Sequence, residues 1–293
     1  MRPFDRSLYP FVGRYFDLDG LAMHYLDEGE GDPVVMVHGN PTWSFYYRRL
    51  VLALRETHRC IVPDHIGMGF SDKPSDARYS YRLVRRVEDL TRLLEGLGVR
   101  ERVTLVVHDW GGMIGMAWAT QHPEAIARLV ILNTAAFPLP SQRAFHLPLR
   151  FTRTPLGGLL VERMNAFSEI AALTCVTRAP MPKEVRRAYT APYDTPANRI
   201  ATLRFVQDIP LAPGDPGYDI VASTADRLGA FVDTPTQIHW GGRDFVFDAP
   251  FLAEWERYLP NADVRRYPDC GHYVLEDAVD EIVPAVRGFI DGI

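Results

Sequence analysis

The chain has 293 residues, a formal net charge of −5 and an apolar share of 47%, which are ordinary values for a globular enzyme. Its mild acidity argues against nucleic acid as a partner, because phosphate binding requires a clustered basic face. Three scattered cysteines without a CxxC pair predict neither a zinc site nor a disulfide framework.

The first predicted element is a β-hairpin. Residues 13–28 alternate around Asp19-Gly20, a dipeptide typical of two-residue hairpin turns. Beyond it, runs that end in loops predict further strands, and the unbroken apolar run at 33–40 suits a strand buried on both faces. These strands are expected within 33–40, 60–67, 103–112, 128–137, 236–244 and 263–272. Helical patterning predicts helices at about 44–55, 80–97, 250–258 and from about 276 onward.

Strands that alternate with helices predict an α/β fold, with a mostly parallel, doubly wound sheet covered on both faces. The alternation stops between about Pro138 and Leu228, where the chain is rich in Pro, Phe and short helical runs. We therefore expect a core formed by residues 1–137 and 229–293, interrupted by an inserted helical lid at 138–228.

Asp109 ends a predicted strand and is followed at once by Trp110 and two glycines that open a helix. This arrangement is that of a nucleophile elbow, which exposes one reactive side chain near the positive end of a helix. A carboxylate nucleophile needs no activating base, and its attack on saturated carbon gives an alkyl ester. An Asp before a helix is more often only a cap, but this context favours Asp109 as a nucleophile.

His272 and Asp244 are the expected partners of Asp109. His272 follows the last predicted strand and is the candidate base that activates water against the ester. Asp244 follows the preceding strand and would orient His272 and stabilise its imidazolium. Taken singly, Asp244 fits ordinary turn chemistry and His272 an ordinary loop. Their order in the chain favours a catalytic triad.

Other histidines lie at predicted strand ends beside an acid, namely His38, His65 and His108 with Asp64. Such a set resembles a metal site, but no HExxH or similar spacing supports one. We therefore expect neither a metal nor a cofactor.

Asn40 and Trp110 are the candidate groups for holding a leaving group. Asn40 follows the strand that supplies oxyanion-hole groups in this kind of fold, and Trp110 directly follows the nucleophile. Both offer neutral N–H donors, which suit a halide or carboxylate that gains charge in the transition state. Without Asp109 beside them, the simpler interpretation would be that Asn40 belongs to a turn and that Trp110 is a packing aromatic.

With these residues in place, the sequence resembles the haloalkane dehalogenases of the α/β-hydrolase superfamily over nearly its whole length. The matching segments are HGNPTW at 38–43, VVHDWGGMIG at 106–115, WGGRDFVFD at 240–248 and GHYVLED at 271–277. The resemblance implies an α/β-hydrolase fold with Asp109 as nucleophile and His272 as base. It also implies that Asn40 and Trp110 hold the leaving halide.

Two branches of that family are disfavoured. One places its acid after the strand that ends near Leu132, where this chain reads Asn133-Thr134 and has no carboxylate, and another takes a halide-binding Trp from the lid, where this chain has none. What remains resembles a third branch, with Asp244 as acid. This branch includes the β-lactone decarboxylases of long-chain olefin biosynthesis, which convert cis-3,4-dialkyl β-lactones to cis-alkenes and carbon dioxide. The similarity to them includes IVPDHIGMG at 61–69, LNTAAF at 132–137, RFVQDIPL at 204–211 and FVFD at 245–248.

The leading hypothesis is therefore β-lactone decarboxylation, with haloalkane hydrolysis to alcohol and halide as the alternative. Epoxide hydrolysis also uses an HDWGG elbow, but it would need acids such as the lid residues Tyr189 and Tyr193. A receptor that binds a hydrophobic ligand without turning it over is the non-enzymatic hypothesis. An intact triad argues against that hypothesis.

A substrate with two alkyl tails predicts a long apolar pocket under the lid. The candidate lining residues are Phe137, Phe145, Phe151, Phe167 and Phe205, although packing of lid against core explains each one equally well. The expected partner is a small hydrophobic substrate, and the resemblance implies an assembly with other olefin-pathway enzymes. Because no signal peptide and no run of roughly 18 apolar residues occurs, we expect no transmembrane segment and a cytoplasmic location.

Overall fold

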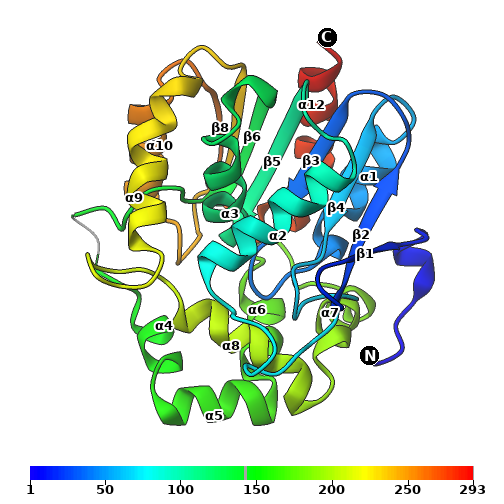
Figure 1. The fold of residues 1–293 in the computed structure, drawn as a ribbon, viewed down its shortest axis with the longest axis vertical. Helices are drawn as coiled ribbons and strands as arrows, with labels where there is room; N and C mark the ends of the chain where they lie inside the picture. Colours follow the sequence, from blue (N-terminus) through cyan, green and yellow to red (C-terminus); the bar gives the residue numbers. More distant parts are fainter. Residues whose placement is uncertain (142–143, 293) are drawn as a thin grey trace.

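An eight-stranded sheet forms the centre of the computed structural model, which describes residues 1–141 and 144–292 (Figure 1). The strand order is β1-β2-β4-β3-β5-β6-β7-β8. The pairs β1–β2 and β2–β4 are antiparallel, and all other pairs are parallel. The strands are β1 (Arg14–Asp17), β2 (Ala22–Glu28), β3 (Pro33–Val37), β4 (Arg59–Pro63), β5 (Val103–Asp109), β6 (Ile126–Thr134), β7 (Thr236–Gly241) and β8 (Asp263–Tyr267).

Helices alternate with the strands on both sides of the lid segment. The α-helices are α1 (Arg48–Leu54), α2 (Leu83–Gly96), α3 (Trp110–Ala119), α4 (Leu147–Thr152), α5 (Pro155–Met164), α6 (Ala166–Thr174), α7 (Lys183–Thr190), α8 (Ile200–Gln207), α9 (Tyr218–Arg227), α10 (Ala249–Tyr258), α11 (Val274–Asp277) and α12 (Val279–Asp291). Short 3₁₀ turns occur at Arg6–Leu8, Ser44–Tyr47, Pro123–Ala125, Ala191–Tyr193, Pro196–Arg199 and Leu228–Phe231. Among the described residues, no helix has the length and apolar character that crossing a membrane requires.

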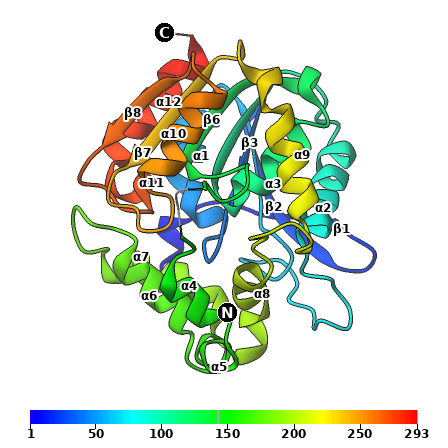
Figure 2. The same ribbon diagram turned by 90° about the vertical axis from the view of Figure 1, so that its left-hand side faces the viewer.

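The central strands are largely buried because helices cover both faces of the sheet (Figure 2). Alternate side chains of β3 enter two different cores, Val35 and Val37 on one face and Val34 and Met36 on the other. Helices α2, α3, α9 and α10 pack on the first face, while α1, α11 and α12 pack on the second. The predicted α/β architecture is confirmed.

The predicted hairpin is β1–β2. Asp19 and Gly20 both have positive φ, 56° and 79°, as a two-residue turn between twisted strands requires. Leu18 and Leu21 flank the turn and exchange backbone hydrogen bonds of 2.8 and 3.2 Å.

The helix predicted at 44–55 is instead two elements, a 3₁₀ turn over Ser44–Tyr47 followed by α1. All four side chains of the 3₁₀ turn are buried. A surface α-helix buries only one stripe of its side chains, so a regular α-helix would not bury four consecutive residues as this turn does.

Between β6 and β7 the described residues form helices and no strand. Helices α4 to α8 gather beyond one end of the sheet, below the core in both views (Figures 1 and 2). In contrast, α9 packs against α3 beside the sheet. We propose that the lid consists of α4 to α8 and that α9, although within the predicted 138–228 range, belongs with the core.

Candidate active site

Asp109 is the last residue of β5, and α3 begins at the next residue. Its φ of 51° lies in the left-handed region, which is unfavourable for a residue with a side chain and is typical of functional turns. The surrounding glycines are needed because a Cβ on Gly111 would lie 1.9 Å from the Val37 carbonyl oxygen. A Cβ on Gly39 would lie 2.0 Å from Asp109 Oδ1. The glycines therefore allow the turn that carries Asp109 to pack against β3.

The Asp109 carboxylate is held by backbone amides and faces one imidazole. Asn40 N–H donates to Oδ1 at 2.6 Å, and Trp110 N–H also donates to the carboxylate. Oδ2 lies 3.6 Å from His272 Nε2. Burial raises the pKa of Asp109 above its ordinary value, and these three neighbours partly oppose the shift. Within the described part of the chain no lysine or arginine pairs with this carboxylate, so its charge is not neutralised by a fixed cation.

His272 lies between two carboxylates. Its Nδ1 is 2.8 Å from Asp244 Oδ2, which fixes Nδ1 as the protonated nitrogen and turns Nε2 toward Asp109. Burial disfavours the imidazolium, but the charge of Asp244 and its hydrogen bond, together with the charge of Asp109, outweigh burial. The pKa of His272 is therefore raised above its ordinary value.

Asp244 is itself held by three donors besides His272. Asn133 Nδ2 donates to Oδ2 at 3.0 Å, and the amides of Val246 and Phe247 donate to Oδ1 at 2.7 and 3.1 Å. The carboxylate is buried, so these bonds compensate for its lost hydration. They also fix the carboxylate behind the imidazole, where it stabilises positive charge.

His108 supports the loop that carries His272. Its Nε2 bonds to the His272 carbonyl oxygen at 2.9 Å. The other histidines at strand ends also bond to the backbone, since His38 Nδ1 contacts the Gly39 oxygen and His65 Nε2 the His38 oxygen. In residues 1–141 and 144–292, no cluster of three or more His, Cys, Asp or Glu side chains is arranged to hold a metal ion.

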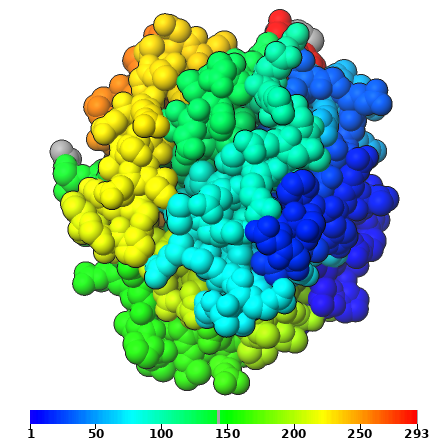
Figure 3. Space-filling model, viewed as in Figure 1, coloured from blue at the N-terminus to red at the C-terminus, as the bar shows by residue number. Residues whose placement is uncertain are grey.

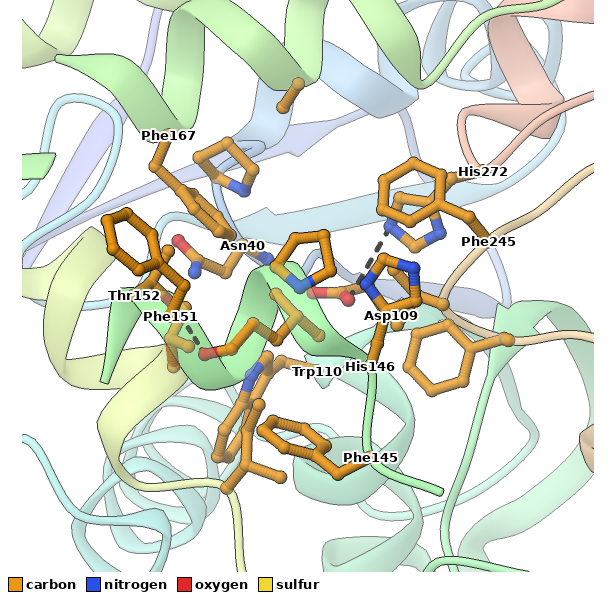
Figure 4. Close-up of a pocket in the computed structure, with 18 of the residues that line it drawn as sticks. Asn40, Asp109, Trp110, Phe145, His146, Phe151, Thr152, Phe167, Phe245 and His272 are labelled. Carbon is orange, nitrogen blue, oxygen red and sulfur yellow. Dashed lines mark hydrogen bonds and ion pairs between the residues drawn. The ribbon is translucent and has the colours of Figure 1, made fainter. Parts of the chain in front are cut away.

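Asn40 and Trp110 lie on the side of Asp109 that is away from His272 (Figure 4). Asn40 Nδ2 donates one hydrogen to the Thr202 carbonyl oxygen at 3.0 Å, which orients the amide and leaves its second hydrogen available. Both side chains line the cavity. A leaving group placed there would meet neutral donors, with Asp109 between it and His272.

A cavity of about 310 Å³ lies between core and lid, with Asp109 and His272 in its wall. Four of the five predicted phenylalanines line it, namely Phe137, Phe145, Phe151 and Phe167. Phe205 does not, which corrects that prediction. Successive residues of a helix point about 100° apart. On α8 it is Val206 that faces the cavity, while Phe205 packs beneath Trp110, with the Arg86 guanidinium 3.4 Å from its ring centre.

Three further residues of the site were not predicted from the sequence. Phe247 stacks on His272 with ring centres 5.8 Å apart. The rings of Phe245 and His146 contact each other with their centres 5.3 Å apart. All three line the cavity. The two phenylalanines lie in the FVFD segment, which directly follows Asp244. Their position next to the acid could have been used to predict that they line the pocket. His146 precedes α4 and lies in no recognised motif.

The two lid tyrosines considered for epoxide chemistry do not reach the cavity. Tyr189 Oη donates to Glu276, and Tyr193 Oη donates to the Thr42 carbonyl oxygen at 3.3 Å. Burial raises the pKa of both phenols well above the ordinary value. Neither can therefore protonate an epoxide oxygen beside Asp109.

The fold and the family comparison define the class of protein. A family model described as the alpha/beta hydrolase fold matches residues 32–279, and the chain belongs to this family. The chain is 55% identical over 285 residues to a cis-3-alkyl-4-alkyloxetan-2-one decarboxylase of Shewanella oneidensis, which covers 97% of this chain and 90% of that protein. It is 50% identical over 292 residues to the protein of the same name from Xanthomonas campestris pv. campestris, with 97% of each chain covered.

Solved structures of haloalkane dehalogenases share the architecture. The enzyme DbeA from Bradyrhizobium elkani superposes with a TM-score of 0.86 at 28% sequence identity, covering 96% of this chain and 98% of that one. The similarity to dehalogenases is therefore weaker in sequence than the similarity to the two decarboxylases, although the fold is the same.

Proposed function

We propose that this protein is a β-lactone decarboxylase, which converts a cis-3-alkyl-4-alkyloxetan-2-one to a cis-alkene and carbon dioxide. The observation that carries the proposal is the 55% identity, over 97% of this chain, to a protein named for that activity. The cavity supports it, because the Asp109 carboxylate, with no lysine or arginine paired to it in the described part of the chain, lies in a largely apolar pocket of a size that suits a small hydrophobic substrate.

The first step is ring opening by Asp109. An Oδ atom forms a bond to ring carbon 4 as the bond from that carbon to the ring oxygen breaks, and the electron pair leaves on the oxygen. The product is an alkyl ester of Asp109 that carries a free carboxylate. Asn40 and Trp110 provide N–H donors for this new charge.

The second step needs no water. The bond from carbon 3 to the carboxylate breaks, carbon dioxide leaves, and its electron pair forms the double bond while Asp109 is expelled as a carboxylate. Displacement inverts carbon 4, and an anti elimination then gives overall syn loss of carbon dioxide, so a cis-lactone yields a cis-alkene. The backbone N–H groups of Asn40 and Trp110 bond to the Asp109 carboxylate, so they stabilise the negative charge that returns to it in this step.

Haloalkane hydrolysis is the second candidate, and the placement of His272 favours it. Nε2 lies 3.6 Å from Asp109 Oδ2 with Asp244 behind the ring. This geometry suits a base that activates water against an Asp109 ester, a step that decarboxylation does not require. Both activities could be carried by one site.

The function is tested by incubating the purified protein with a cis-3,4-dialkyl β-lactone and identifying the products by gas chromatography with mass detection. One cis-alkene is expected for each lactone consumed. Conversion to the β-hydroxy acid without alkene, or halide release from 1-bromoalkanes with no reaction on the lactone, would overturn the proposal.

Alkene formation is expected to persist at lower pH than halide-releasing turnover. Ester hydrolysis needs neutral His272, and because the pKa of this group is raised, turnover falls as pH drops through a value above its usual one of about 6.5. Alkene formation needs only ionised Asp109. Protonation of His272 adds a positive charge beside Asp109 and favours the ionised nucleophile. Measuring the rates of both reactions between about pH 5 and 9 gives the pH at which each rate falls on the acid side. If both rates fell at the same pH, this account would be contradicted.

Two further features of the function are proposals from the resemblance to the olefin-pathway branch. The enzyme would act in the cytoplasm, and it would contact the pathway enzymes that supply the lactone. A ring-forming reaction on a long-chain acid must precede this one, because the strained lactone is its substrate.

A further inference from the structure

The largest group of exposed apolar side chains in the described part of the chain lies on three consecutive lid helices. Within this group, which also holds Met164 at the end of α5, we call the six residues that form pairs three or four positions apart the lid face. It consists of Leu147 and Phe151 on α4, Leu156 and Leu159 on α5, and Ile170 and Leu173 on α6. Exposure reaches 73% at Leu147 and is 46% at Phe151. A set of this size on a single segment is typical of a surface that contacts another apolar phase.

The spacing within each helix directs these side chains outward. Pairs three or four residues apart share one stripe of an α-helix, as the three pairs of the lid face do. In both ribbon views α5 lies at the end of the molecule opposite the C-terminus (Figures 1 and 2), and α4 and α6 pack against it. The space-filling view places this segment on the outer surface (Figure 3).

The lid face is continuous with the catalytic cavity. Phe151 and Ile170 are exposed and also line the cavity. Phe245, from the loop after β7, has the same two properties. These three side chains therefore form an apolar mouth, through which the wall of the pocket passes into the outer surface of the lid.

The charges of the lid face are basic. Arg150 and Arg163 are its exposed ionic residues, and within the described residues neither forms an ion pair. The acidic side chains of the same helices, Glu162 and Glu169, are only partly exposed. This local excess contrasts with the charge of −5 for the whole chain. Exposed apolar stripes flanked by arginine fit an interface with anionic lipid headgroups.

We propose that the lid face docks on the surface of a lipid bilayer that carries anionic headgroups. The protein lies on the bilayer, with the apolar stripes entering the boundary between headgroups and acyl chains. A symmetric contact between two copies would place Arg150 and Arg163 of both molecules near one another, which disfavours self-association through this face. In this position, long-chain substrate would pass from the lipid into the cavity, and this part of the proposal rests on the proposed function.

The experiment measures sedimentation of the full chain with vesicles of phosphatidylcholine alone or in an equimolar mixture with phosphatidylglycerol. Binding is expected to be stronger with phosphatidylglycerol and to weaken as salt is raised. The double variant Leu156→Gln, Leu159→Gln removes two apolar anchors that do not line the cavity. It should lower the partition coefficient at least about tenfold, because each buried Leu contributes strongly to insertion.

The matched control is Leu52→Gln, Val84→Gln, which changes two exposed apolar residues of α1 and α2 in the core. It should bind vesicles like the unchanged protein. Absence of vesicle binding, or equal loss in both double variants, overturns the proposal. So does a dimer in sedimentation velocity that the Leu156→Gln, Leu159→Gln variant converts to monomer. Vesicle binding by a protein that makes no alkene would refute the proposed function and leave the docking surface intact.

Discussion

Replacement of Asp109 by asparagine should lower alkene formation by at least about 10⁴-fold, the scale seen when a covalent nucleophile is removed. The amide is neutral and does not attack carbon 4, while its oxygen can still accept the N–H groups of Asn40 and Trp110. Burial raises the pKa of Asp109, so the folded protein disfavours its charge. The thermal midpoint of Asp109→Asn should therefore be unchanged or higher. Alkene yield and calorimetry measure the two effects.

Asp226→Asn is the matched control, since this carboxylate is exposed on α9. It should keep the activity of the unchanged protein. Alkene production by Asp109→Asn at a comparable rate would remove Asp109 from the mechanism, provided that peptide mapping finds no deamidation back to aspartate.

The second large effect is expected from His272→Ala, and it should separate the two chemistries. With a 1-bromoalkane, Asp109 can still displace bromide, but the ester is no longer hydrolysed. Turnover should fall by at least about 10³-fold, within the range for loss of a general base. Intact-protein mass spectrometry should show one added alkyl group. With the lactone, alkene formation should fall by no more than about tenfold, or 1.4 kcal/mol in barrier, because Asp109 leaves without water.

The fold should tolerate this substitution, since Asp244 keeps its bonds from Asn133, Val246 and Phe247. The double variant Asp109→Asn, His272→Ala should acquire no alkyl group, and peptide mapping of the single variant should locate the adduct on Asp109. An adduct on another residue would contradict the assignment of the nucleophile. Equal loss of both activities would instead make His272 a participant in decarboxylation.

The core elements were predictable because their signals are local. The run that becomes β5 is mostly apolar and leads into the pattern Asp-Trp-Gly-Gly, so both the buried strand and the elbow are predictable from adjacent residues. His272 and Asp244 were predicted as partners from their order in the chain and their position after strands, and the structure does place the two side chains in contact. The distance that joins them, 2.8 Å, depends on how β7 and β8 pair and was not accessible from sequence alone.

The lid was less predictable because its helices are short and are stabilised by packing. A prediction that Phe205 lines the pocket needs the rotation of α8 relative to Trp110, and an error of one residue turns a side chain by about 100°. The place of α9 is a related case. Its sequence is helical whether it belongs to lid or core, and its contact with α3 supports our proposal that it belongs with the core.

Asn133 is the next-to-last residue of β6, and its side chain reaches across to Asp244 in the loop that follows β7. Two neighbouring strand ends therefore converge behind one imidazole. A carboxylate at position 133 would lie a single hydrogen bond from the point that the Asp244 oxygen occupies. Relocation of the acid during evolution would then leave the sheet undisturbed. Two homologues with the acid at position 133 in one and at position 244 in the other can therefore place the same negative charge behind the imidazole. Equivalent roles are then better recognised from the position of the charge in the structure than from the aligned residue.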